Sequence, residues 1–463
     1  MKILLIKPRV YSDTVIPPVG LGYLASNIDR EHDVKIIDCL KDKINLKELN
    51  AAVKGYDPDI VGIQVYNIDK HVAREYLEKI KDLNTDIVSV IGGPYPSCEP
   101  SRVFDYFGNV LDYAFCGEAE KGFTSLIKKL SNDETCDSFE EINGLIWRKD
   151  GIIEVNANEY SDNLDELGFP SWDLLKPEDY PPSPIGAFMK QYPVAPVLVS
   201  RGCPYECSFC AGSRITGTTV RYRSVSSMME EFKLLYEKHG IREIHILDDN
   251  FTYSRDYVRR FCESLLEQKI DLKIACPNGI RIDTLDGDLL QLMKKAGFYV
   301  VHIGIESGSQ KILNYMGKVL EIGFIEKRIK EIRSAGLDIC GYFIMGYPGE
   351  TADDIKDTIK LALKLPLTRA MFMNFLPIPG TQIYDQLKQS GSLKDDEYDR
   401  NTFYNANCTV GPLTKRQLKL LQIKAFLLFY LRPGILLGNI FRMYNVRHMM
   451  YIAGRVLRIV TNA

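Results

Sequence analysis

The sequence predicts an α/β protein with an N-terminal doubly wound parallel sheet, a partial (β/α)6 barrel and a helical C-terminal tail. Short apolar runs alternate with helical patterns over residues 1–130, and the same alternation returns over residues 196–390. Alternating strands and helices are typical of parallel sheets with helices on both faces. Residues 411–463 differ, because apolar runs there are separated by basic residues and no acidic residue occurs.

The first region, residues 1–130, is predicted to be a Rossmann-type sheet. Its expected strands are residues 2–6, 34–37, 60–65, 87–91 and 113–115, with helices between them, such as 70–83. Ligands of such sheets bind at the carboxyl ends of the strands. Three glycine-rich loops are expected at that edge: PPVGLGY at 17–23, GGPYPS at 92–97 and CGEAE at 116–120. Glycine lets a backbone approach a large ligand, but tight turns use it too, so both interpretations stay open.

Residues 131–195 are predicted to be a linker, which prolines 181, 182 and 184 keep extended. Residues 196–390 contain six expected strands, at 196–200, 242–247, 272–276, 299–305, 338–345 and 369–375. Helices are expected between them, such as 226–239 and 286–296. Six strand–helix units are two short of a complete TIM barrel, so we expect a partial barrel with its site at the carboxyl ends of the strands.

The segment RGCPYECSFC, residues 201–210, follows the first expected barrel strand and has the spacing C-x3-C-x2-C. Three thiolates this close, from Cys203, Cys207 and Cys210, can bind one face of a four-iron cluster, whose irons normally all carry thiolates. Three ligands leave one iron open for chemistry, so the spacing predicts such a cluster. The alternative is a zinc site, which usually needs a fourth Cys or His in a second short pair, whereas the nearest histidine, His239, stands alone.

This cysteine segment resembles that of the radical S-adenosylmethionine (SAM) superfamily, which has an aromatic residue, here Phe209, before the last cysteine. The resemblance implies that the open iron holds the amino and carboxylate groups of SAM. One electron from the cluster then yields a 5′-deoxyadenosyl radical. An electron donor such as flavodoxin or ferredoxin is therefore expected.

The N-terminal loops resemble those of the cobalamin-binding domain that precedes many radical SAM modules. This resemblance implies cofactor-binding roles for six loop residues: Gly20, Gly22, Gly92, Gly93, Gly117 and Glu118. The sequence lacks the D-x-H-x-x-G motif whose histidine ligates cobalt, and His71 is expected on a helix surface. The domain is therefore expected either to hold cobalamin without a histidine ligand or to keep the fold without the cofactor.

Four further candidates follow the later barrel strands. Asp248, in LDDNF, is expected either to accept hydrogen bonds from the SAM ammonium or ribose or to cap the next helix. Arg281 is expected to pair with a carboxylate, because a buried unpaired arginine is costly. The segments GIESG at 304–308 and GYPGET at 346–351 resemble SAM-side loops of the family, which implies cofactor contacts for Glu306 and Gly346.

The function expected from these features is a cobalamin-dependent radical SAM enzyme, a C-methyltransferase or cyclase that acts on an unactivated carbon of a small-molecule or lipid-like substrate. The first alternative is a radical SAM enzyme that does not use cobalamin and keeps the N-terminal domain as a scaffold. The second is an iron–sulfur electron carrier, for which a large barrel is unnecessary.

Charge and hydropathy restrict the partners and the compartment. A formal net charge of −3 predicts no attraction to nucleic acid. The apolar runs are too short for a signal peptide or a membrane span, so a cytoplasmic protein with reduced cysteines is expected. The C-terminal region, residues 391–463, is expected to be helical and basic. Its nine lysines and arginines after residue 411 favour either a tail packed on the barrel or peripheral contact with an anionic membrane.

Overall fold

The computed structural model describes residues 1–463 except 11, 13, 132–137, 186–187, 394–402, 405–408, 444 and 462–463, and the side chains of 447 and 455–461. The chain divides into two compact units. Unit 1 comprises Met1–Pro181 and Ala211–Tyr222, and unit 2 comprises Pro182–Cys210 and Arg223–Ala463. The chain therefore passes from one unit to the other three times, after residues 181, 210 and 222.

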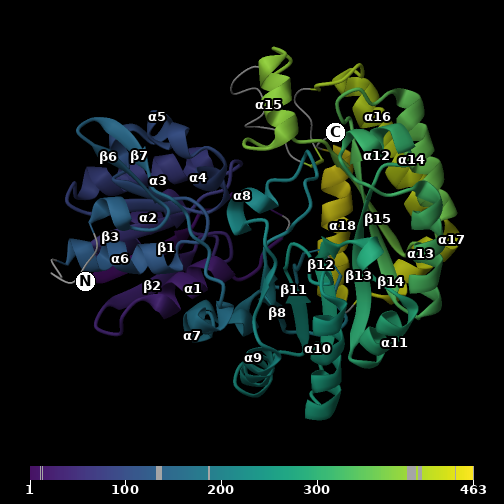
Figure 1. The fold of residues 1–463 in the computed structure, drawn as a ribbon, viewed down its shortest axis with the longest axis horizontal. Helices are drawn as coiled ribbons and strands as arrows, with labels where there is room; N and C mark the ends of the chain where they lie inside the picture. The colour runs from purple at the N-terminus through teal and green to yellow at the C-terminus, as the bar shows by residue number, and fades with distance from the viewer. Residues whose placement is uncertain are drawn as a thin grey trace. The chain divides into compact units, whose positions relative to one another are not determined.

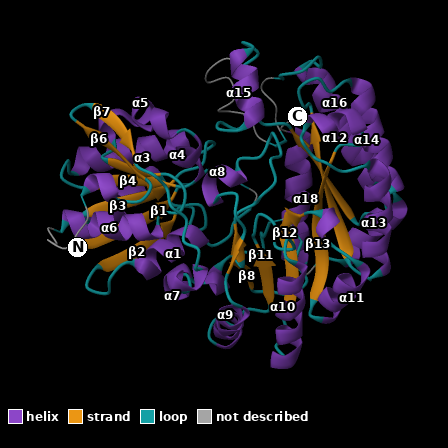
Figure 2. Cartoon of the chain, in the orientation of Figure 1, coloured by secondary structure: helices purple, strands orange, loops and turns teal. Residues whose placement is uncertain are grey.

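Unit 1 is built on a seven-stranded sheet in the order β2-β1-β3-β4-β5-β6-β7 (Figure 2). The first five strands are parallel, which confirms the predicted doubly wound sheet: β1 (Lys2–Lys7), β2 (Asp33–Asp38), β3 (Ile60–Gln64), β4 (Val88–Gly92) and β5 (Tyr113–Phe115). The helices between them and after them are α1 (Val19–Asn27), α2 (Leu46–Tyr56), α3 (Lys70–Leu83), α4 (Pro94–Cys98), α5 (Val103–Phe107) and α6 (Glu120–Leu130). The strand order reverses between β1 and β3, where ligands of such sheets bind.

The last two strands of this sheet lie inside residues 131–195, which the sequence predicts to be a linker. Strand β6 (Leu145–Lys149) pairs antiparallel with β5 and with β7 (Ile152–Val155). Asp150 and Gly151 join them with φ of 52° and 82°, the paired positive values that suit a two-residue hairpin. The helix α7 (Trp172–Leu175) then packs closely on α1 at Gly22, where an added Cβ would lie 2.5 Å from the Leu175 side chain. Most of the predicted linker is therefore part of unit 1.

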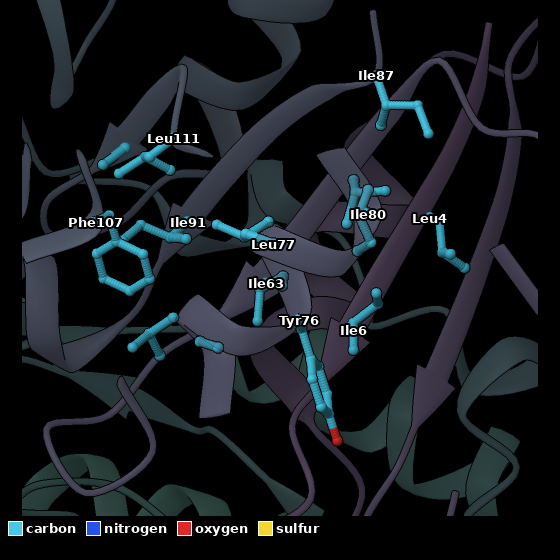
Figure 3. Close-up of a cluster of buried hydrophobic side chains, with 14 of the residues drawn as sticks. Leu4, Ile6, Ile63, Tyr76, Leu77, Ile80, Ile87, Ile91, Phe107 and Leu111 are labelled. Atoms are coloured by element: carbon cyan, nitrogen blue, oxygen red, sulfur yellow. The ribbon is translucent and has the colours of Figure 1, made fainter. Parts of the chain in front are cut away.

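Both faces of the unit 1 sheet are apolar, as expected for a sheet covered by helices on both sides. Successive residues of a strand face opposite sides, so Leu4 and Ile6 join one core cluster while Ile3 and Leu5 join the other. Figure 3 shows the first cluster, in which one face of helix α3 packs on the strands through Tyr76, Leu77 and Ile80.

Unit 2 contains six parallel strands in the order β15-β14-β13-β12-β11-β8, each followed by at least one helix (Figure 1). The strands are β8 (Val194–Val197), β11 (Glu243–Ile246), β12 (Lys273–Ile280), β13 (Phe298–Glu306), β14 (Asp338–Met345) and β15 (Arg369–Asn374). The main helices are α9 (Val225–Glu237), α10 (Arg255–Gln268), α11 (Gly287–Lys295), α12 (Gln310–Tyr315), α13 (Ile322–Ser334), α14 (Ala352–Lys364) and α15 (Gln382–Gln389). This arrangement confirms the predicted six strand–helix units, and β8 and β15 are the two edges of the described sheet.

The C-terminal region is helical, as the sequence predicts, with α16 (Lys415–Tyr430), α17 (Pro433–Phe441) and α18 (Val446–Thr461). Helix α16 packs along β15, where the Tyr430 hydroxyl donates to the Ala370 carbonyl at 2.8 Å and Gln422 Nε2 donates to the Phe372 carbonyl at 2.9 Å. In the described part of the chain no single helix has both the length and the hydropathy of a membrane span. Helices α16 and α17 reach those limits only as a pair, which is bent by 76°.

Candidate cofactor sites

The three predicted cluster ligands lie on one loop of unit 2, after strand β8. Cys203 and Cys207 are half-buried, and Cys210 is exposed. Burial raises the pKa of both the Cys203 and the Cys207 thiol. Within the described residues, no three His, Cys, Asp or Glu side chains are placed to hold one metal ion. Thiols lose their protons when they bind a metal, so metal binding at this loop works against the rise in thiol pKa that burial causes.

Ser208, between the second and third cysteines, fixes the backbone of this loop. Its N–H donates to the Met316 carbonyl at 3.0 Å, and its carbonyl accepts from the Ile383 N–H at 3.0 Å. Its hydroxyl lies 2.7 Å from the Tyr347 hydroxyl. Gly317 also packs against the cysteine loop. Its φ is +69°, and an added Cβ would lie 3.1 Å from the Glu206 carbonyl oxygen. The loop is thus held from several elements at the carboxyl edge of the barrel.

Phe209 is one of the residues implied to bind a cofactor. The structure packs it against an apolar cluster that includes Ile312, Met316, Tyr347 and Ile383. The aromatic residue therefore anchors the cysteine loop to α12, α15 and the loop after β14.

Two ion pairs flank the cysteines. Lys318 donates to Glu306 at 2.7 Å, and the two side chains are only 7% and 9% exposed. Arg281 makes two hydrogen bonds to Asp283, at 2.9 and 2.8 Å, which is the carboxylate pairing that the sequence predicts. The cations Lys318 and Arg281 both act to lower the pKa of the Cys207 thiol, against the effect of burial. They can stabilise thiolates there, or a carboxylate of a bound ligand.

Tyr205 of the cysteine loop contacts one of these two cations. The Arg281 guanidinium lies 3.7 Å from the centre of the Tyr205 ring, within the range of a cation–π contact. The sequence predicts Arg281 as a site residue but gives no signal for Lys318, because the Lys318–Glu306 pair joins residues 12 positions apart across a strand end.

Asp248 accepts hydrogen bonds from the chain segment that follows β8. Its carboxylate accepts from the N–H groups of Val199 and Ser200, both at 2.8 Å, and from the Ser200 hydroxyl at 2.6 Å. Burial raises its pKa to about 7. The carboxylate thus holds the chain between β8 and the cysteine loop, so its placement favours neither the helix cap nor a direct cofactor contact.

Asn250, two residues further on, is a candidate that the sequence reasoning missed. Its side chain is 1% exposed, and neither its amide oxygen nor its amide nitrogen has a hydrogen-bond partner among the described residues. Buried amides are nearly always paired. This unpaired amide at the carboxyl end of β11 is therefore suited to a bound ligand.

Gly346 faces the C-terminal tail. Its φ is +81°, and an added Cβ would lie 2.8 Å from the Leu418 side chain of α16. Its N–H donates to Glu350 at 2.6 Å. The glycine is thus required by the backbone and by tail packing, whichever cofactor the loop also contacts.

In unit 1 the glycine loops lie at the carboxyl ends of β4 and β5 and at the start of α1. Gly92 has no atom within 4 Å of an added Cβ, and beside Gly20 the nearest atom, in the Gln64 side chain, is 3.9 Å away. Gly93 differs, because its φ is +100° and an added Cβ would lie 3.2 Å from the Val65 carbonyl oxygen. Gly20 and Gly92 therefore leave open surface for a ligand, whereas Gly93 and Gly22 are required by the fold.

The loop after β5 is fixed by an ion pair. Glu118 accepts from Arg221 at 2.6 and 3.0 Å, and these side chains are 9% and 5% exposed. Arg221 also donates to the carbonyls of Ser161 and Thr216, and Gly117 is packed against Asn158. Glu118 thus has a structural partner 103 residues away, which sequence reasoning did not find.

The loop after β3 offers both apolar and polar groups to a ligand. Tyr66 and Ile68 are 46% and 39% exposed, and the buried Asn67 amide oxygen has no partner among the described residues. Asp69 accepts from the Tyr66 N–H and fixes the loop. His71 is exposed on α3. With the open glycines 20 and 92, these groups fit a large, mainly apolar ring system at the switch point of the sheet.

Two family models match the chain. The model of the radical SAM superfamily matches residues 197–362, and the model of the B12 binding domain matches residues 9–127. The first range contains the cysteine loop and the barrel strands β11 to β14, and the second contains the three glycine loops and the strands β2 to β5.

Two relatives match most of the chain. An uncharacterised methyltransferase of Pyrococcus horikoshii is 32% identical over 99% of this chain and 97% of its own. The cytidylyl-2-hydroxyethylphosphonate methyltransferase of Streptomyces wedmorensis is 28% identical over 82% of this chain and 79% of its own.

Among solved structures, the radical SAM methyltransferase TsrM from Kitasatospora setae, with cobalamin and a 4Fe–4S cluster bound, matches with a TM-score of 0.68. The match covers 84% of this chain and 75% of that one at 20% identity, and it shows a shared fold.

Proposed function

This chain belongs to the cobalamin-dependent radical SAM enzymes, and we propose that it transfers a methyl group to an unactivated carbon of a small-molecule or lipid-like substrate. The observation that carries the proposal is the 32% identity to a methyltransferase over almost the whole of both chains. The B12 match over residues 9–127 argues against the alternative without cobalamin. Ring closure at such a carbon remains the second candidate, because an anaerobic magnesium-protoporphyrin IX monomethyl ester cyclase of Cereibacter sphaeroides is 23% identical over 94% of this chain.

The cofactors of this family are a 4Fe–4S cluster, SAM and cobalamin. When bound, the cluster would supply the electron for reductive SAM cleavage, and cobalamin would supply the methyl group. Cys203, Cys207 and Cys210 are the proposed iron ligands, on the loop that Ser208 and Phe209 hold in place. We propose that a donor such as flavodoxin or ferredoxin supplies the electron to the cluster. We also propose that the reaction takes place in the cytoplasm.

The residues around the cysteine loop divide into those that support it and those that face a ligand. Asp248 fixes the strand that leads into the loop, and the Glu306–Lys318 pair places a cation beside Cys207. Asn250 and Arg281 are the proposed contacts to the polar groups of SAM. The Asn250 amide has no hydrogen-bond partner among the described residues, and Arg281 adds positive charge beside the cysteines.

The proposal is tested with the anaerobically reconstituted full-length protein. Changing any one of the three loop cysteines to Ala should remove most of the bound iron and the ~400 nm absorbance, and with them reductive SAM cleavage. C262A is the matched control, because Cys262 is a buried thiol of α10, and it should keep iron and cleavage. A loop variant that still cleaves SAM would refute the site. Transfer of a labelled methyl group from SAM to metabolites then distinguishes methylation from ring closure.

A further inference from the structure

The C-terminal helices expose an unusual amount of apolar surface. Half of the exposed large apolar side chains among the described residues lie between residues 420 and 450. They are Leu420, Leu427, Leu428, Leu431, Leu436, Leu437, Ile440, Phe441, Val446, Met449 and Met450. Phe441 is 85% exposed and Met450 is 69% exposed. Isolated exposed apolar residues are ordinary, but exposed apolar side chains that gather on three consecutive helices indicate an interaction surface.

The exposed residues lie opposite the side by which each helix packs on the barrel. In α16 the buried residues are Leu418, Gln422, Ala425 and Phe429, at helical spacing. Leu420, Leu427 and Leu431 are spaced by seven and four residues, so they share the opposite face of the helix. The helix is therefore apolar on two sides, of which the barrel covers one.

The same division holds in α17 and α18. In α17 Asn439 is buried, while Leu436, Leu437, Ile440 and Phe441 are exposed. In α18 His448 and Ile452 are buried, while Val446, Met449 and Met450 are exposed. We call these eleven exposed side chains of the three helices the tail surface.

The charges around the tail surface favour an anionic partner. Residues 411–463 contain no Asp or Glu. Lys415, Arg416 and Lys424 of α16 are exposed. Arg416 and Lys424 lie three or four residues from Leu420 or Leu427, so they flank the apolar stripe. Arg442 is occupied by Asp338, at 2.8 Å, and Arg432 donates to the Leu363 carbonyl, so these two serve the barrel instead. A second copy of this surface would bring like charges together, whereas anionic lipid headgroups above an apolar interior match both features.

We propose that the tail surface docks this protein on an anionic membrane, with the apolar side chains in the interface and Lys415, Arg416 and Lys424 among the headgroups. The inference goes beyond the methyl-transfer reaction and does not depend on it. Helices with an apolar and a basic side bind in the plane of such interfaces. The bend between α16 and α17 suits helices that lie on a surface.

The test is sedimentation of the full-length protein with vesicles of phosphatidylcholine, alone or mixed with phosphatidylglycerol. We expect binding to the mixed vesicles at low salt and a loss of at least about tenfold in L427S/L431S/F441S. The matched control is I152S/V155S/L266S, three exposed apolar residues outside the tail, which should bind like the wild type. All six side chains are exposed, so both variants should fold.

The charge contribution is measured with K415Q/R416Q/K424Q. Each cation contributes about fivefold to binding of an anionic surface, so this variant should bind on the order of 100-fold more weakly at low salt. Failure of the wild type to sediment with mixed vesicles overturns the proposal. Equal binding to uncharged vesicles also overturns it, as does a change from dimer to monomer in L427S/L431S/F441S, which would make the surface a contact between copies.

Discussion

Gly92 is the residue at which a change tests the cobalamin site without disturbing the fold. Open space surrounds an added Cβ there, whereas Gly93 has a positive φ and close backbone atoms. We expect G92L to fold like the wild type but to lose cobalamin binding, because the side chain fills space that the corrin needs. Hydroxocobalamin absorbance of the reconstituted protein and its melting temperature measure the two effects.

The control for this experiment is G55L in helix α2, where an added Cβ also meets nothing within 4 Å. It should keep cobalamin binding. If G92L binds cobalamin as tightly as G55L does, the loop after β4 does not contact the cofactor.

Glu350 makes a pH-dependent contribution to stability. Its Oε2 accepts from the N–H groups of Gly346 and Tyr347, its Oε1 has no partner among the described residues, and burial raises its pKa to about 8. The folded state therefore keeps a proton that the unfolded state loses above its ordinary pKa of 4.5. This contribution is complete below pH ~4.5 and is lost as the pH rises to ~8.

We expect E350Q, which stays neutral, to gain stability relative to the wild type by a few kcal/mol as the pH rises from 5 to 9. Urea denaturation of both proteins at several pH values measures the difference. A difference that does not change with pH would show that Glu350 is ionised in the folded protein.

At the residue scale, the sequence indicates which positions carry chemistry but not which partners hold them. The cysteine spacing and the carboxylate partner of Arg281 are local in the chain, since Asp283 is two residues away. Glu118 and Glu306 are predicted as cofactor residues, yet they bind Arg221 and Lys318. Such pairs depend on contacts between distant segments, which a single sequence does not display.

At the element scale, the strands and helices of both sheets follow from the apolar periodicity, and the missed hairpin has an identifiable cause. The segment IWRKDGIIEV, residues 146–155, has an Asp-Gly pair between two apolar runs. Such a pair is a strong signal for a β-hairpin. A composition rich in polar residues on both sides of it favours a linker instead. Strand β6 pairs with β5, which covers Leu145 and Ile146, and β7 pairs with β6.

The loop after β14 and helix α16 depend on each other through one contact. G346A should destabilise the protein by about 1–3 kcal/mol, because alanine is strained at φ +81° and its Cβ meets Leu418. L418A creates space at that contact, so G346A/L418A should be more stable than the sum of the two single changes predicts. Denaturant midpoints of the three variants and the wild type measure this coupling. Strictly additive losses would show that strain at Gly346 alone accounts for the effect.

At the scale of the whole molecule, the tail is part of the barrel unit. The side chains of Leu418, Ala425 and Phe429 are at most 2% exposed, and Gln422 binds the backbone of β15. Removal of residues 411–463 should therefore expose apolar surface of unit 2 and give insoluble protein. The soluble fraction after expression, compared with L427S/L431S/F441S, measures this. A soluble, monomeric truncated protein would contradict the packing of α16.

The passage of the chain between the units has a consequence for the order of events during synthesis. Unit 1 is completed by Ala211–Tyr222, a segment that follows the cysteine loop in the chain. At about 5–20 residues per second, the 103 residues between Glu118 and Arg221 take roughly 5–20 s to be translated. During that time the carboxylate beside the glycine loop has no cation. The N-terminal unit of a nascent chain thus reaches its final ion pairing only after the iron-binding loop has been made, and that loop gains its own supports, Met316, Tyr347 and Ile383, later still.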